Sequence, residues 1–105
     1  MTFDPAQCTG FEWDAGNVAK IATKQGVSPE EAEQVFAQRP LLVHRDPGHS
    51  GTEVRWDALG RTREERRLFV AFTVREGRIR VISARPMSRK ERRAYAKAEN
   101  ETVRA

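Results

Sequence analysis

The sequence lacks several features that would each indicate a class of protein. It contains one cysteine, Cys8, so no disulfide can form within the chain. One thiol and two histidines are also too few for a closed zinc site. No apolar run approaches the roughly 18 residues that a membrane-spanning helix needs. The start, Met1 to Pro5, has neither the basic residues nor the apolar stretch of a signal peptide. We therefore expect a small cytoplasmic protein with no membrane contact.

Apolar residues are also scarce. They make up 38% of the 105 residues, and charged residues make up 32%. This length suits one compact domain and is too short for two. We expect a single domain over residues 1–105, with residues 1–10 and 99–105 loosely ordered because they carry no apolar stripe.

Positive charge is concentrated at one end of the chain. Residues 1–40 hold three Lys/Arg and six Asp/Glu, whereas residues 75–105 hold ten and four. Fifteen of the nineteen cations are arginine, whose planar guanidinium makes bidentate contacts with phosphate. The basic end therefore indicates a polyanionic partner, although a solvated charged helix would give the same composition.

Helix signals occur near both ends. Asp14 is a suitable N-cap for a helix over 15–25, and Gly26 is suited to end it in a left-handed conformation. Two Ser-x-x-Glu capping boxes, Ser28 to Glu31 and Ser88 to Glu91, predict helices that end near Arg39 and Ala98.

Between these helices the apolar period changes from helical to alternating, which predicts four strands, over residues 41–45, 52–59, 68–74 and 78–84. Residues Phe11 to Trp13 are compatible with a short additional edge strand. The order predicts an α+β fold with two N-terminal helices, a four-stranded antiparallel sheet and a C-terminal helix.

The last hairpin predicts which side chains share a face. If Glu76-Gly77 is a two-residue turn, Arg75 lies opposite Arg78 and Thr73 opposite Arg80. One face is then the apolar core face, with Leu68, Val70, Phe72, Val74, Ile79, Val81 and Ser83. The other carries Thr73 with the three arginines, and also Phe69, Ala71, Ile82 and Ala84. Glu53 and Arg55 join the second face if Val54 and Trp56 point to the core, whereas Arg85 has core-face parity.

The ordered set of motifs resembles the BrnT toxins of type II toxin–antitoxin systems over about Phe11 to Tyr95. The residues that carry the resemblance are Phe11-x-Trp13-Asp14, Asn17-x-x-Lys20, Lys24-x-Gly26-Val27-Ser28-Pro29-Glu30-Glu31-Ala32, Asp46-x-x-His49, Glu53-x-Arg55, Phe72-Thr73-x-Arg75, Arg78 to Arg85 and Glu91-Arg92-x-x-Tyr95. Gln25 departs from the pattern, because many relatives have histidine there.

The resemblance implies a RelE-like fold and a ribonuclease that inhibits translation by cleaving RNA. It also implies neutralisation by a BrnA-type antitoxin of the ribbon-helix-helix type. The complex of toxin and antitoxin would contact operator DNA through the antitoxin alone.

The residues fit cleavage of RNA without a metal ion or another cofactor. Such cleavage needs a base for the 2′-hydroxyl, cations for the phosphorane and an acid for the leaving oxygen. We expect catalytic roles for His49, Glu53, Arg80 and Tyr95, and RNA-binding roles for Arg55, Thr73, Arg75, Arg78, Arg85, Arg89, Lys90 and Arg92. A surface histidine, an arginine-paired glutamate and a core tyrosine remain the structural alternatives. The competing function is a non-catalytic nucleic-acid-binding regulator, because phosphate binding and phosphate cleavage use the same arginines.

Overall fold

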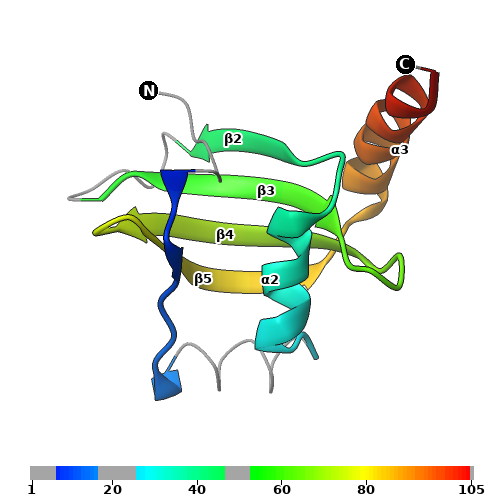
Figure 1. The fold of residues 1–105 in the computed structure, drawn as a ribbon. Coiled ribbons are helices and arrows are strands. Elements are labelled where there is room, and N and C mark those ends of the chain that lie inside the picture. Colours follow the sequence, from blue (N-terminus) through cyan, green and yellow to red (C-terminus); the bar gives the residue numbers. More distant parts are fainter. Residues whose placement is uncertain (1–6, 17–25, 47–52, 105) are drawn as a thin grey trace.

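The computed structural model describes residues 7–16, 26–46 and 53–104. These residues form one sheet with a helix across one face and a second helix at one end (Figure 1). The strands are β1 (Gly10–Phe11), β2 (Leu42–Asp46), β3 (Arg55–Arg61), β4 (Arg67–Arg75) and β5 (Arg78–Pro86), and the helices are α2 (Pro29–Ala37) and α3 (Arg89–Arg104).

The sheet has five strands in the order β1-β5-β4-β3-β2 and is mixed. Strands β2 to β5 form the predicted antiparallel meander, but β1 pairs in parallel with β5, with Gly10 opposite Arg78 and Phe11 opposite Ile79. The prediction of a four-stranded antiparallel sheet is therefore wrong. Two residues of pairing have no alternating pattern of their own, so the sequence gives little sign that they belong to the sheet.

Of the two predicted N-terminal helices, α2 is the one whose whole range is described, and Ala15 and Gly16, where the other was predicted to begin, are helical. The predicted helix over 15–25 falls mostly on residues outside the described ranges. Gly26 has the left-handed conformation predicted for it, with φ of 65°. The capping box of α2 is formed, because the Ser28 hydroxyl accepts from the Glu31 amide and the Glu31 carboxylate accepts from the Ser28 amide.

The hydrophobic core lies between α2 and the facing side of the sheet. It contains Val27, Ala32, Val35, Phe36, Trp56, Ala58, Leu68, Val70, Phe72, Ile79, Val81 and Ala84. The Phe36 ring contacts Phe72 edge-on, with ring centroids 5.0 Å apart. Gly60, which follows the predicted strand over 52–59, lies in β3 directly beneath α2. A Cβ atom there would lie 2.5 Å from Cγ1 of Val35.

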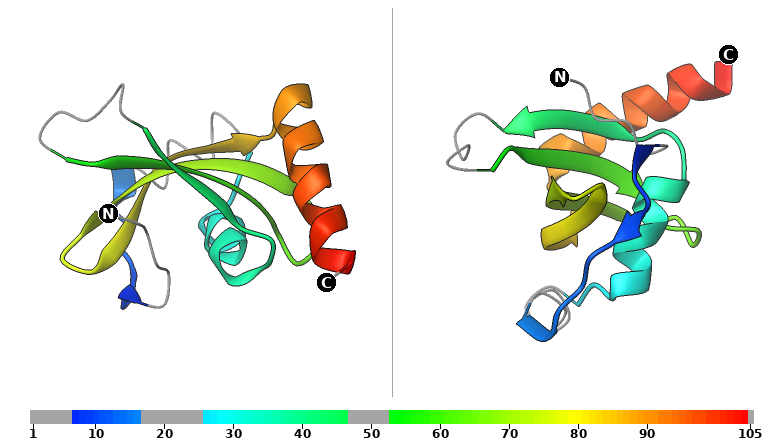
Figure 2. Two further views of the ribbon diagram at one scale, coloured as in Figure 1. Left: turned by 90° about the horizontal axis from the view of Figure 1, so that it is seen from above. Right: turned by 60° about the vertical axis from the view of Figure 1, so that its left-hand side comes forward.

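Helix α3 starts with the second predicted capping box, in which Ser88 and Glu91 exchange hydrogen bonds of 2.8 and 3.2 Å. It continues to Arg104 rather than ending near Ala98. Figure 2 shows α2 against one side of the sheet and α3 across one end, so neither of these helices covers the middle of the opposite side. Among the described residues no helix combines the length and apolarity that a bilayer span requires.

Candidate functional site

The β4–β5 hairpin has the predicted two-residue turn. Glu76 and Gly77 both have positive φ, 51° and 77°, as a type I′ turn requires. Arg75 therefore pairs with Arg78 and Thr73 with Arg80. The side chains of these four residues share the side of the sheet opposite α2. We call this side the arginine face; its strand residues are Leu42, His44 and Asp46 of β2, Arg55, Asp57, Leu59 and Arg61 of β3, Arg67, Phe69, Ala71, Thr73 and Arg75 of β4, and Arg78, Arg80, Ser83 and Arg85 of β5.

A β-bulge changes the predicted faces beyond this point. The register shifts between Ala71 and Phe72, so Phe72 pairs with Val81 but Ala71 pairs with Ser83. Ser83 therefore lies on the arginine face and Ala84 in the core, which is the reverse of the prediction. The same shift places Arg85, which had core-face parity, on the arginine face opposite Phe69. Val74, at the hairpin end of the core face, is 36% exposed rather than buried.

Carboxylates surround the guanidinium groups at the hairpin end of the face. Arg75 makes a bidentate ion pair with Glu53, with Nη2 2.7 Å from Oε1. Arg80 donates to Glu12 at 2.9 Å and to Asp14 at 2.7 Å. Glu12 also lies 3.8 Å from Arg75 and so connects the two arginines. These five side chains, which we call the ion-pair cluster, come from β4, β5, the residues just before β3 and the segment after β1.

The ion pairs shift the pKa values of Glu53, Arg75 and Arg80 towards their charged forms. The hydrogen bond from Arg75 holds the pKa of Glu53 below its ordinary value, despite an opposing effect of desolvation. The hydrogen bond to Glu53 raises the pKa of Arg75, and that to Asp14 raises the pKa of Arg80. At neutral pH Glu53 is therefore ionised, able to accept a proton but weakly basic.

Glu12 and Asp14 are functional candidates that the sequence reasoning missed. They lie 68 and 66 positions from Arg80 in the chain and reach it because β1 pairs with β5. The pairing of β1 with β5 would have placed both carboxylates beside Arg80 if it had been predicted, since Glu12 follows the paired residue Phe11 directly.

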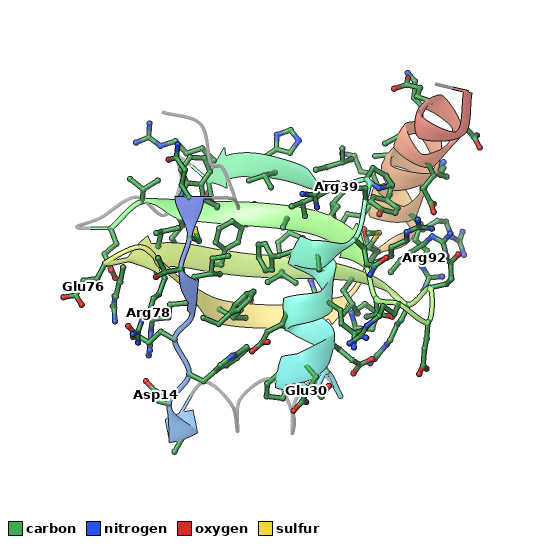
Figure 3. All side chains as sticks on the ribbon, in the orientation of Figure 1. Asp14, Glu30, Arg39, Glu76, Arg78 and Arg92 are labelled. Atoms are coloured by element: carbon green, nitrogen blue, oxygen red, sulfur yellow. The ribbon has the colours of Figure 1, made fainter. Side chains whose placement is uncertain are left out.

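Other predicted RNA-binding side chains make no ion pair with the described part of the chain: Arg55, Arg78, Arg89, Lys90 and Arg92. Figure 3 places Arg78 beside the hairpin and Arg92 near α3, so these cations lie towards both ends of the sheet. Arg92 lines a surface hollow of about 380 Å³ together with Arg66 and Arg67. The cations thus form a track along the sheet rather than one cluster.

Two predicted site residues have hydroxyl groups that are bound within the protein. The Thr73 hydroxyl donates to the carbonyl oxygen of Val54 at 2.7 Å, and only 3% of Thr73 is exposed. The Tyr95 hydroxyl donates to the carbonyl oxygen of Pro40 at 2.6 Å, and Tyr95 is fully buried. Burial raises the pKa of Tyr95 to about 12. Tyr95 packs at the α3 end of the sheet, away from the hairpin and the ion-pair cluster.

His49 falls outside the described residues. It belongs to segment 47–52, which joins β2 to β3, and Asp46 and Arg55 pair across those strands at the hairpin end of the sheet. His44, the other histidine of the chain, is exposed on β2 opposite Asp57. Within the described ranges no three His, Cys, Asp or Glu side chains are grouped so that they could hold a metal ion.

Arg85 has a different environment from the other arginines. Its guanidinium lies over the Phe69 ring, 4.1 Å from the centroid. Its Nη1 and Nη2 donate to the two carboxylate oxygens of Glu91 at 2.8 and 3.0 Å, and Nη1 also donates to the carbonyl oxygen of Pro86. The hydrogen bond to Glu91 raises the pKa of Arg85 and that from Arg85 lowers the pKa of Glu91.

Together these features define a small α+β protein in which a β-meander carries cations and carboxylates on one face and a helix on the other. The family model described as "Ribonuclease toxin, BrnT, of type II toxin-antitoxin system" matches residues 13–91. The chain therefore belongs to the BrnT family of ribonuclease toxins, as its motifs indicated, and has an antitoxin as its partner. No curated protein matches it.

Proposed function

We propose that this protein is a cytoplasmic endoribonuclease that stops translation by cleaving RNA on the arginine face without a metal ion. The observation that carries the proposal is the ion-pair cluster, where an ionised carboxylate, Glu53, is hydrogen-bonded to one of two neighbouring guanidinium groups. A carboxylate of this kind can accept a proton, and guanidinium groups can bind the phosphate that gains charge in the transition state.

The reaction is a transesterification within the RNA. The 2′-oxygen attacks phosphorus, its proton passes to a base, the bond from phosphorus to the 5′-oxygen breaks, and that oxygen takes a proton from an acid. Glu53 and His49 supply the base and the acid between them, in an assignment that the sequence leaves open. Arg80 and Arg75 bind the phosphate oxygens, with Arg55 and Arg78 beside them.

The carboxylates of the cluster act as internal substitutes for phosphate. Asp14 is half-exposed, whereas the side chain of its partner Arg80 is 22% exposed. An RNA phosphate that replaces Asp14 on Arg80 exchanges one anion for another, so the arginine is never left without a partner. This exchange keeps the binding site assembled in the absence of RNA.

Tyr95 has no place in this mechanism, because its hydroxyl is buried and donates to Pro40. We further propose that the antitoxin is a BrnA-type protein of the ribbon-helix-helix class, that an acidic segment of it covers the arginine face, and that the complex contacts operator DNA through the antitoxin alone.

The test is incubation of the purified protein with RNA in the presence of a chelator across a pH series. We expect cleavage products with a 2′,3′-cyclic phosphate, as transesterification requires. Arg80→Ala should lower the cleavage rate at least about a hundredfold, because it removes a donor to the phosphorane. It should also abolish growth arrest while the far-ultraviolet circular dichroism spectrum stays unchanged.

Arg63→Ala is the matched control, because Arg63 is an exposed arginine outside the arginine face, and it should cleave like the unaltered protein. RNA that is bound but stays intact at every pH would instead support the non-catalytic regulator. Undiminished toxicity of Arg80→Ala would exclude the ion-pair cluster from the mechanism.

A further inference from the structure

The arginine face has a second region, distinct from the ion-pair cluster, where flat and apolar groups are aligned across the strands. Leu42 pairs with Leu59, Leu59 with Phe69, and Phe69 with Arg85. All four residues are partly exposed. They form a continuous row across β2, β3, β4 and β5 at the α3 end of the face.

The position of Arg85 in this row makes it poorly suited to phosphate. Phosphate is bound through the edge of the guanidinium, where the N–H groups point. In Arg85 that edge donates to both carboxylate oxygens of Glu91 and to the Pro86 carbonyl. Arg55 and Arg78, in contrast, make no ion pair with described residues. The role of phosphate binding that we predicted for Arg85 therefore has little support from its geometry.

The plane of Arg85 is suited to another ligand. One side of the plane lies on Phe69 and the side chain keeps 37% exposure, so we infer that a ligand reaches the opposite side. The ion pair with Glu91 holds the plane in place, since Glu91 is fixed by the capping box of α3. Aromatic rings and guanidinium planes are the groups on which proteins stack the bases of single-stranded RNA.

We propose that Phe69 and Arg85 form a base-stacking subsite for single-stranded RNA, in which an unpaired base lies on the outer plane of Arg85 beside Leu59. The proposal rests on the proposed function for its ligand. Charge supports the same ligand, because the row lies between two groups of cations that make no ion pair within ranges 7–16, 26–46 and 53–104: Arg55 and Arg78 at the hairpin end, and Arg89 and Lys90 in α3. A chain bound to both groups of cations crosses the row.

The subsite has a fixed distance from the ion-pair cluster. Thr73, which is opposite Arg80, is four residues from Phe69 along β4, which corresponds to roughly 13 Å. The stacked base therefore belongs to a nucleotide beyond the one whose phosphate lies at Arg80. Contacts there select or position the RNA without touching the reacting atoms.

The experiment is an abasic scan with an RNA oligonucleotide whose 2′-hydroxyls are methylated, so that it binds but cannot be cleaved. Removing one base at a time should reveal a position where binding to the unaltered full-length protein falls about tenfold, as expected for the loss of one stacked base. In Phe69→Leu and in Arg85→Lys that penalty should disappear, because each variant removes a planar group while keeping apolar character or charge.

Arg55→Gln is the matched control. It removes a cation from the same face but no stacking plane, so it should weaken binding of every oligonucleotide alike and leave the abasic penalty unchanged. Circular dichroism checks that both variants are folded. If Phe69→Leu does not fold, Arg85→Lys gives an independent result.

The outcomes separate the two proposals. No sensitive base in the unaltered protein, or a penalty that survives in either variant that folds, would overturn the stacking subsite. Suppose that the unaltered protein shows the abasic penalty and both variants lose it, while natural RNA stays intact. In that case the stacking subsite is supported and the catalytic proposal fails. Absence of RNA binding would overturn both.

Discussion

Tyr95 is the only tyrosine in the chain, and it anchors α3 to the segment before β2. Its hydroxyl donates to Pro40 inside the protein, where the phenol has no exposed surface. A tyrosine that follows basic residues in a nuclease is attractive as a proton donor, and the sequence alone favours that role as much as a core role. The hydrogen bond decides for the structural role, because a buried carbonyl that loses its donor is costly.

We predict that Tyr95→Phe lowers the free energy of unfolding by about 1 kcal/mol at neutral pH and leaves RNA cleavage unchanged. The alkaline range gives a sharper result. The tyrosine loses its proton near pH 10 in the unfolded chain and near pH 12 in the folded protein. Its contribution to stability is therefore complete below pH 10 and is lost as the pH rises to about 12.

Urea unfolding at pH 9, 10 and 11 measures this effect. Stability of the unaltered protein should fall across the series, and Tyr95→Phe should fall less steeply because it has no phenol to ionise. Equal slopes for the two proteins would contradict the assignment, and a loss of cleavage at neutral pH would return Tyr95 to the mechanism.

At the scale of elements, α2 lies so close to β3 at Gly60 that there is no space for a side chain. Gly60 lies under Val35, and a Cβ atom at Gly60 would be 2.5 Å from Val35 Cγ1 and 3.2 Å from the Val35 carbonyl oxygen. The first contact is shorter than any allowed between such atoms. The helix would therefore have to move away from the sheet to admit even one methyl group.

We predict that Gly60→Ala lowers the free energy of unfolding by about 1–3 kcal/mol, seen as a lower melting temperature. Val35→Ala in the same chain removes the clashing methyl groups. The double variant should therefore lose less free energy of unfolding than the two single variants lose in sum. Additive effects of the two substitutions would show that the contact between α2 and β3 is not what makes glycine necessary.

The elements also explain how far sequence reasoning reached. The two capping boxes, the Glu76-Gly77 turn and the pairing of Arg75 with Arg78 are local, since residues a few positions apart determine them, and all were predicted. The pairing of β1 with β5 joins residues 68 positions apart over two residues, and no local pattern reports it. Without it, Glu12 and Asp14 could not be placed beside Arg80.

The bulge at Ala71 and Phe72 is the second feature that the sequence did not predict. The apolar residues of β5 change phase between Val81 and Ile82, but the unbroken apolar run of β4 does not show which face each residue occupies, and our prediction kept one register through both strands. Because one inserted residue exchanges the two faces, Ser83, Ala84 and Arg85 were all assigned to the wrong side. The stacking of Arg85 on Phe69 follows from this one-residue shift.

At the scale of the whole molecule, the cations are spread along the sheet from the hairpin to α3. Those near the hairpin belong to or surround the ion-pair cluster, whereas Arg89, Lys90 and Arg92 are exposed at the start of α3. A bound RNA strand that extends from Arg80 past Phe69 reaches α3 next. These three cations should therefore contribute to binding over distance rather than to the reacting phosphate.

We predict that replacing Arg89, Lys90 and Arg92 together by glutamine lowers the salt dependence of RNA binding. Each phosphate that a cation neutralises contributes about 0.7 to the slope of log K against log salt for single strands, so the slope should fall by about 2. Cleavage at saturating RNA should be unchanged, because the ion-pair cluster is intact.

Binding measured between 50 and 200 mM salt, roughly the range over which such contacts lose most affinity, gives the slope. Arg63→Gln, which removes an exposed arginine outside the arginine face, should leave it as it was. A slope that the triple variant does not change would mean that bound RNA ends before α3, and the track would then be confined to the sheet.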